Sequence, residues 1–171
     1  MGISNMLPVN TSGLQLIKVQ TVGSAVASVT VTDVFSATYD NYRIIYSNFT
    51  ASTNGSLSMQ LNNSTGTTYQ LSGIYLTIGS ATVNGYGPAA STKWTDVSPA
   101  GTTSGYCLMD IFSPYLSSPT RARTTGNSGS GYYDFGAVDT SSNSNTGFIL
   151  AHVTGGATLT GGTIRVYGYR N

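Results

Sequence analysis

The chain has 171 residues, enough for one domain with its own core, and 8% of them are charged. Seven Lys and Arg residues against six acidic residues, all of them Asp, leave a net charge of +1. Binding to nucleic acid by phosphate neutralisation, or to a membrane surface by charge, is therefore not expected, because both need a basic patch.

The composition predicts an all-β protein. Thr, Val and the 12 Tyr residues favour strands. Glu is absent and Lys is scarce, although both are strong helix formers on protein surfaces. The chain also lacks the 3.6-residue periodicity of a long amphipathic helix.

The first thirteen residues contain Pro8 and no periodicity, so residues 1–13 are expected to form a short N-terminal arm. Such an arm frays unless a partner holds it. No shift in composition divides residues 14–171, which are therefore predicted to be a single domain.

Short runs of alternating apolar and polar residues follow along the chain, separated by turns rich in Gly, Asn and Pro. They predict strands over residues 14–22, 25–34, 42–49, 56–62, 68–78, 106–112, 120–125, 132–138, 146–154 and 162–170. Asn54 and Gly55 are typical of a two-residue hairpin turn, so the strands on either side of them are expected to pair.

Residues 81–100 contain several Gly and Pro residues and are expected to be a loop within a long connection over residues 79–105. Nine or ten short strands at this spacing are typical of a sandwich or barrel. A long connection suits a Greek-key crossover better than a meander. The predicted fold is therefore an antiparallel β-sandwich of jelly-roll-like topology.

No group of residues has the spacing of a catalytic or metal site. His152, the single histidine, lies in an apolar strand with Phe148 and Leu150 on its face. A packed or inter-subunit histidine is therefore favoured over a catalytic base or metal ligand. Cys107, the single cysteine, is expected to be a buried thiol, because no basic residue adjoins it.

The six Asp residues are scattered along the sequence. Asp110 and Asp134 could converge in space as the two carboxylates of a glycosidase, whereas turn formation accounts for residues such as Asp40 and Asp139. A calcium site over residues 139–145 would have one carboxylate where several are usual. We therefore expect no catalytic residue, no cofactor, no metal and no enzymatic activity.

The last predicted strand carries an unusual face. Arg165, Tyr167 and Tyr169 share one side of it, and Ile164 and Val166 on the other side are expected to point into the core. Its tyrosines either fill the edge of the core with their hydroxyls in water, or form an interface or a carbohydrate-stacking surface. Because Arg and Tyr are enriched in interface hot spots, we expect this face to contact a neighbouring subunit or another partner.

Arg121 and Arg123 form a second feature of this kind. They lie two residues apart and therefore share one face of a polar strand. They form either a solvated surface or a fork that grips carboxylates or carbonyls of a partner.

Three segments resemble motifs of a known class of proteins: residues 35–44 (FSATYDNYRI), 113–115 (SPY) and 163–169 (TIRVYGY). They are similar to strand and bend motifs of small all-β virion proteins of tailed bacteriophages. In that class the motifs recur across one jelly-roll-like domain, which corresponds to residues 35–171. Such domains occur as head decoration or fibre proteins and as distal domains of tail fibres and spikes.

The resemblance implies a structural protein of the virion. A domain that follows only a short arm suits a capsid decoration protein on the outer surface of the head, assembled as a homotrimer on the major capsid protein or another virion protein. The alternative is a tail fibre or receptor-binding knob that recognises host surface glycans. The sequence begins without a signal peptide, so we expect synthesis in the host cytoplasm.

Overall fold

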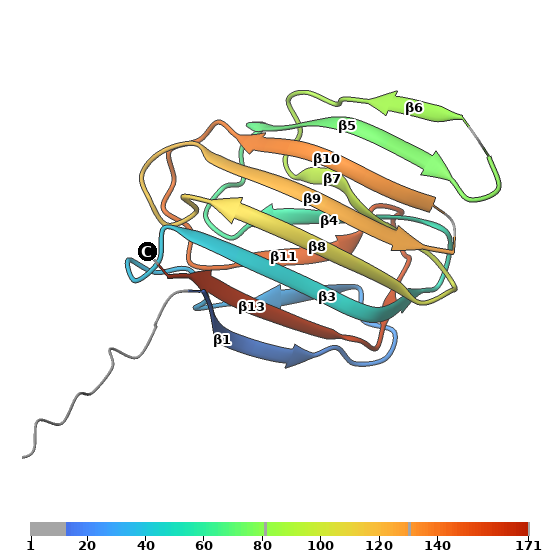
Figure 1. The fold of residues 1–171 in the computed structure, drawn as a ribbon, viewed down its shortest axis with the longest axis horizontal. Helices are drawn as coiled ribbons and strands as arrows, with labels where there is room; N and C mark the ends of the chain where they lie inside the picture. Colours follow the sequence, from blue (N-terminus) through green and yellow to red (C-terminus); the bar gives the residue numbers. More distant parts are fainter. Residues whose placement is uncertain (1–12, 81, 130, 171) are drawn as a thin grey trace, which may run out of the picture.

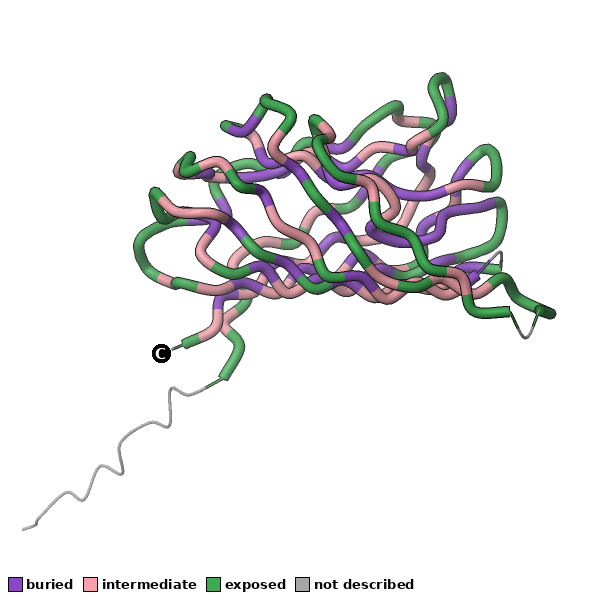
Figure 2. Tube along the Cα trace, turned by 90° about the horizontal axis from the view of Figure 1, so that it is seen from above, coloured by how far each residue is buried: buried purple, intermediate pink, exposed green. Residues whose placement is uncertain are grey.

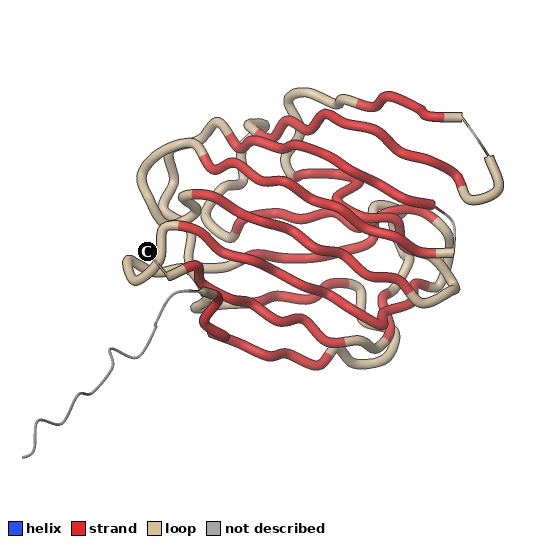
Figure 3. The backbone as a smooth tube through the Cα atoms, viewed as in Figure 1, coloured by secondary structure: helices blue, strands red, loops and turns tan. Residues whose placement is uncertain are grey.

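The computed structural model describes residues 13–80, 82–129 and 131–170. Its strands are β1 (Leu14–Thr21), β2 (Ser28–Val31), β3 (Asn41–Ala51), β4 (Gly55–Leu61), β5 (Tyr69–Thr77), β6 (Val83–Tyr86), β7 (Trp94–Ala100), β8 (Gly105–Phe112), β9 (Thr120–Ser128), β10 (Gly131–Asp139), β11 (Phe148–His152), β12 (Leu159–Thr160) and β13 (Thr163–Tyr169). The described residues include no helix, and so none that could cross a membrane (Figure 3). The prediction of an all-β protein is confirmed.

The strands form two antiparallel sheets that lie one over the other (Figure 1). The large sheet has the order β1-β13-β3-β8-β9-β10-β5-β6, with β12 paired to one end of β3. The small sheet has the order β2-β11-β4-β7. The predicted arm, residues 1–13, lies outside the described residues except for Gly13, whose carbonyl accepts a hydrogen bond from the Arg170 amide.

The core lies between the two sheets and is rich in aromatic side chains. Buried positions alternate with less buried ones along the strands (Figure 2). In β3 this alternation buries Tyr42, Ile44 and Tyr46, which point inward. Trp94 of β7 is fully buried, and its Nε1 donates a hydrogen bond to the Val138 carbonyl at 3.0 Å. The buried indole N–H is therefore paired, as burial of a polar group requires.

The segments that carry the phage-like motifs meet at one end of the large sheet. β3 and β13 are neighbours, and the Ser113 amide donates to the Asp40 carbonyl at 2.9 Å. Gly168 lies directly under the ring of Tyr39, where a Cβ atom would collide with the ring carbons. Tyr39 of the first motif and Gly168 of the last motif are therefore in direct contact.

The hairpin predicted around Asn54 and Gly55 is wrong. β3 pairs with β13, β8 and β12 in the large sheet, whereas β4 pairs with β11 and β7 in the small sheet. The intervening residues carry the chain from one sheet to the other. Turn chemistry is local, but the choice of partner depends on strands that lie far away in the sequence.

The loop predicted over residues 81–100 is also wrong, because it contains strands β6 and β7. β6 has only four residues, which is too short for a recognisable alternation. β7 contains Pro99 and an irregular register against β4, between Leu57 and Met59. Both features remove the period of two that a strand prediction depends on.

The two sheets differ in width. The small sheet ends at β7, whereas the large sheet continues past β10 through β5 to β6 (Figure 1). The core-facing side of β5 and β6 is therefore only partly covered, and Tyr86 on that side keeps 40% of its surface exposed.

Candidate functional site

All five residues predicted to form an interface lie on one surface, which we call the outer face: the side of the large sheet turned away from the small sheet. Arg165, Tyr167 and Tyr169 alternate with the buried Ile164 and Val166, so the predicted orientation of β13 is confirmed. Residues directly opposite one another on paired strands share a face. That rule extends the outer face from β13 to its neighbours.

One row of opposed residues crosses the middle of the outer face. Tyr167 lies opposite Arg43 of β3, Arg43 opposite Asp110 of β8, and Asp110 opposite Arg123 of β9. The exposed side chains of Arg121 and Arg123 alternate with buried residues of β9. The structure therefore brings the two predicted groups, one at each end of this row, onto a continuous surface.

The centre of the outer face is a hydrogen-bonded cluster of three residues, Arg43, Asp110 and Tyr169. Arg43 donates from Nε and Nη2 to the two carboxylate oxygens of Asp110, both at 2.7 Å. The Tyr169 hydroxyl donates to Asp110 Oδ1 at 2.6 Å, and the Arg43 guanidinium lies 5.6 Å from the centroid of the Tyr169 ring. Bidentate contact and a ring fix the guanidinium in one orientation.

The cluster shifts the pKa values of its members. Burial acts to raise the pKa of Asp110, but hydrogen bonds from Arg43 and Tyr169 outweigh it and leave that pKa below its ordinary value. Burial, together with the bond to Asp110, raises the pKa of Tyr169 to about 12. Asp110 is thus a carboxylate and Tyr169 a neutral phenol at neutral pH, which keeps donors and acceptors matched.

Arg43 and Asp110 are not among the residues that the sequence predicts for the interface. They are separated by 67 positions, and only the β3–β8 register makes them neighbours. Their shared signal is a charged residue between two large apolar or aromatic neighbours: Arg43 follows Tyr42 and precedes Ile44, and Asp110 lies between Met109 and Ile111. Such a residue is seldom buried without a partner of opposite charge.

Asp110 and Asp134 do converge, on either side of Arg123. Asp134 accepts a hydrogen bond from Arg123 Nη2 at 3.3 Å, and both carboxylates line a hollow of about 170 Å³. The general acid of a glycosidase needs a raised pKa, whereas the pKa of Asp110 is lowered. The arrangement therefore suits a charge network that orients arginines.

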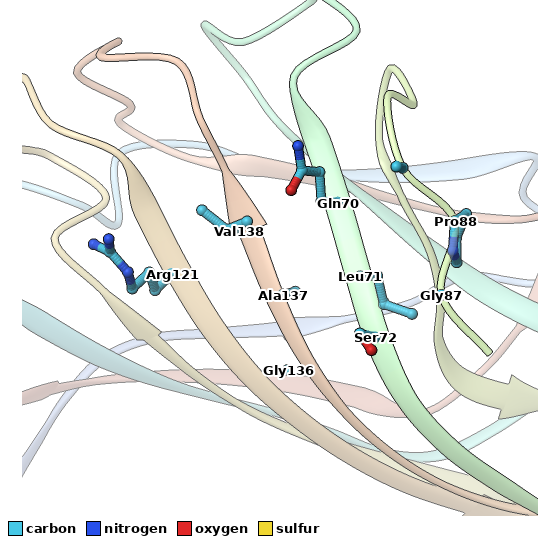
Figure 4. Close-up of a pocket in the computed structure, with 10 residues that line it drawn as sticks. Gln70, Leu71, Ser72, Gly87, Pro88, Arg121, Gly136, Ala137 and Val138 are labelled. Carbon is cyan, nitrogen blue, oxygen red and sulfur yellow. The ribbon is translucent and has the colours of Figure 1, made fainter. Parts of the chain in front are cut away.

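Arg121 borders a shallow hollow of about 520 Å³ across β9, β10 and β5 (Figure 4). Gly136 opens the floor of this hollow, since a Cβ atom there would meet only the Ser72 carbonyl at 3.9 Å. Pro88 lies on the far side. Within the described part of the chain, the side chain of Arg121 makes no hydrogen bond or ion pair, so its guanidinium is available to a partner.

Apolar side chains surround the charged cluster. Most of the large apolar and aromatic residues that are exposed in the described ranges lie on the outer face or its extension over β5 and β6. They are Leu14, Leu16, Val19, Ile74, Val83, Tyr106 and Phe112, each exposed by 41% to 57%. Exposed apolar side chains that gather on one face of a sheet, in a chain with few charges, are typical of an interaction site.

The other candidate residues, His152, Cys107 and Asp139, are buried within the fold. His152 is buried beside Phe148 and Leu150, and its Nδ1 accepts a hydrogen bond from the Thr154 amide at 3.1 Å. Cys107 is buried, which raises the pKa of its thiol to about 11. Asp139 is buried and bonded to Thr68 and Ser141.

Across residues 13–80, 82–129 and 131–170, no three His, Cys, Asp or Glu side chains are grouped as metal ligands would be. Comparisons with protein-family models and with curated protein sequences gave no match to this chain. The outer face is therefore interpreted from its own geometry.

Proposed function

We propose that this chain is a structural protein of a tailed-bacteriophage virion, a decoration protein that covers the outer surface of the capsid. In this proposal the outer face binds neighbouring copies or the major capsid protein, and the protein acts without catalysis. The observation that carries it is the outer face itself, where all five predicted interface residues and a preorganised charge cluster share one exposed, partly apolar surface.

The strand order supports a jelly-roll β-sandwich as the underlying fold. Without β5, β6, β9, β10 and β12, the eight remaining strands lie in the orders β1-β13-β3-β8 and β2-β11-β4-β7. Numbered afresh along the chain these are 1-8-3-6 and 2-7-4-5, the pattern of a jelly roll. We infer that β5–β6 and β9–β10 are two inserted hairpins, which pair with each other and widen one sheet. Jelly rolls are common in viral capsid proteins, an analogy at the level of the fold.

The motif contacts support the resemblance to phage virion proteins. The three motifs occupy one corner of the molecule, where the Tyr39 ring covers Gly168 and the Ser113 amide is bonded to Asp40. Motifs that share a contact describe one local arrangement of the fold. They are therefore more informative together than as three separate short matches.

The composition of the outer face supports protein as its partner. Tyr and Arg are the residues most enriched in interface hot spots, and apolar residues surround the cluster of Arg43, Asp110 and Tyr169 as a hot-spot periphery would. The cluster is fixed by its own hydrogen bonds. Binding would therefore cost little side-chain entropy. The homotrimeric state is proposed from the phage resemblance.

Two exposed leucines allow a matched test. Leu16 on the outer face and Leu116 in a loop are exposed by 45% and 44%. Leu16→Ala and Tyr167→Ala are expected to weaken assembly by about 1–3 kcal/mol each, whereas Leu116→Ala is not. Sedimentation velocity over a dilution series measures the association, and urea denaturation checks that each variant is folded.

Equal association of the two leucine variants would contradict the use of the outer face. The position in the virion needs a second measurement, the copy number per particle on a stained gel of purified virions. Hundreds of copies are expected of a decoration protein. One or two dozen would instead support the tail fibre or receptor-binding knob that recognises host glycans.

A further inference from the structure

A further pocket lies on the opposite side of the large sheet from the outer face. It has a volume of about 270 Å³ and is lined by Tyr75, Tyr86, Asp96, Tyr133 and Phe135. We call it the aromatic pocket. It lies where β5 and β6 extend past the edge of the small sheet (Figure 1). The proposed virion function makes no use of it.

A glycine of β5 allows two rings of the aromatic pocket to meet. Gly73 of β5 lies opposite Phe135 of β10 on one side and opposite Tyr86 of β6 on the other. With no side chain between them, the two rings approach to 6.1 Å between centroids. A Cβ atom on Gly73 would come within 2.6 Å of a Phe135 ring carbon. The gap in β5 is therefore filled by rings from both neighbours.

The rings are steeply inclined to one another, at interplanar angles of 61° to 87°. Tyr133 and Phe135 have centroids 5.5 Å apart with an interplanar angle of 87°, and Tyr75 and Tyr133 are 5.8 Å apart at 61°. Phe135 is 1% exposed and forms the deep wall, whereas Tyr86 is 40% exposed and forms the rim. Walls that meet at corners surround a rounded group better than a flat one.

An irregularity in β7 supplies the carboxylate of the pocket. Leu57 lies opposite Ser98 and Met59 opposite Trp94, so three residues of β7 face the one residue between Leu57 and Met59. Asp96 is the middle residue of those three and has a φ of +62°. Bulges of this type redirect side chains and are over-represented beside functional sites, as is a left-handed backbone at a residue other than glycine.

The charge of Asp96 affects the pKa values of two tyrosines of the pocket. Burial is the main cause that raises the pKa values of Tyr86 and Tyr133, and the negative charge of Asp96 adds to it in both. Among the described residues that line the pocket, Asp96 alone is charged. The aromatic pocket is therefore an electronegative site made of ring faces and one carboxylate.

We propose that the aromatic pocket binds a methylated ammonium group. Such a cation is attracted to ring faces and to a carboxylate, and its methyl groups fill the spaces between steeply inclined rings. A neutral sugar would instead stack on one flat ring face, whereas the rings here meet at angles of 61° to 87°. The volume lies below the usual ~300–1,000 Å³ of ligand pockets, which suits a single headgroup or side-chain tip.

Choline and its neutral isostere 3,3-dimethylbutan-1-ol, which replaces the ammonium nitrogen by carbon, separate charge from shape. Two-dimensional NMR titration of the full chain is expected to show choline shifting signals of Tyr86 and Asp96, with the isostere binding at least tenfold more weakly. Equal binding of the two probes, or no binding of choline, would overturn the proposal. Tighter binding of a methyl galactopyranoside would also overturn it, in favour of a sugar site.

Two variants test the assignment within the protein. Asp96→Asn removes the charge and keeps a residue that tolerates a positive φ, and Tyr86→Leu removes the exposed ring. Each is expected to weaken choline binding by about three- to thirtyfold. Asp134→Asn and Tyr106→Leu make the same changes on the outer face and are the matched controls.

Unchanged choline affinity in both Asp96→Asn and Tyr86→Leu would overturn the proposal, and so would an equal loss in the controls. Two further ligands identify the molecule that carries the methylated ammonium group. Tighter binding of phosphocholine indicates a lipid headgroup, and tighter binding of Nε-trimethyl-lysine indicates a protein side chain. Because this pocket and the outer face lie on opposite sides of one sheet, failure here leaves the proposed virion function untouched.

Discussion

Replacement of Asp110 by Asn is expected to destabilise the fold by about 2 kcal/mol. The carboxylate accepts three hydrogen bonds, two from Arg43 and one from Tyr169. Removing one partner of a buried ion pair costs ~3–5 kcal/mol, whereas an exposed pair contributes ~0.2–1 kcal/mol. The side chains of Arg43 and Asp110 are 30% and 20% exposed, which places this pair between those limits.

Asp134→Asn is the matched control. Its partner Arg123 has a side chain 73% exposed, and their contact is longer, at 3.3 Å against 2.7 Å. We expect it to cost less than about 0.5 kcal/mol. With a urea m-value of about 2 kcal/mol per molar, the midpoint should fall by about 1 M for Asp110→Asn and by less than about 0.3 M for Asp134→Asn.

The acid range gives a second check on Asp110. The pKa of Asp110 is lowered in the folded state. Its contribution to the free energy of unfolding is therefore complete above its ordinary pKa of about 3.9, and it is lost as the pH falls through the pKa of the folded state. The difference in free energy of unfolding between wild type and Asp110→Asn should therefore become smaller only in strong acid. Equal urea midpoints for the two Asp variants at pH 7 would refute the reasoning.

Three further outcomes are expected. Burial lowers the pKa of His152, so the unfolded state takes up a proton at a higher pH than the folded state. The free energy of unfolding should therefore fall as the pH drops below about 6.5. The melting temperatures at pH 7.5 and pH 5.5 should differ less in His152→Gln than in wild type. Cys107, with a pKa of about 11, should react with a thiol reagent only after unfolding, and rapid labelling of the native protein would contradict its burial. Gly162→Ala should cost at least about 2 kcal/mol more than Gly79→Ala in urea denaturation. Both glycines have a φ near +80°, but only at Gly162 would a Cβ atom meet the Ser47 carbonyl, at 2.5 Å.

The orientation of side chains within strands was predictable from the sequence. In β13 and β9 the alternation is strict, so the outward orientation of Arg165, Tyr167 and Arg123 follows from a period of two. The same reasoning places His152 with Phe148 on the inward side of β11. Local pattern is sufficient where one face is apolar and the other polar.

Partner choice was not predictable in the same way. Asn54 and Gly55 have the chemistry of a hairpin turn, yet β3 and β4 belong to different sheets. The aromatic pocket was missed for a related reason. It needs Gly73 between two strands that are paired only in the folded chain, and Asp96 in an irregular strand that resembled a loop.

The strands at the two margins of the large sheet determine whether another chain can add a strand to it. β1 is interrupted by a bulge between Leu16 and Lys18, and Lys18 turns inward to donate to the Thr32 carbonyl at 2.8 Å. β6, at the other margin, is only four residues long. Bulges, inward lysines and short strands all discourage another chain from adding a strand. In the assembly that we propose, copies would therefore associate through the outer face and not by adding strands at these margins.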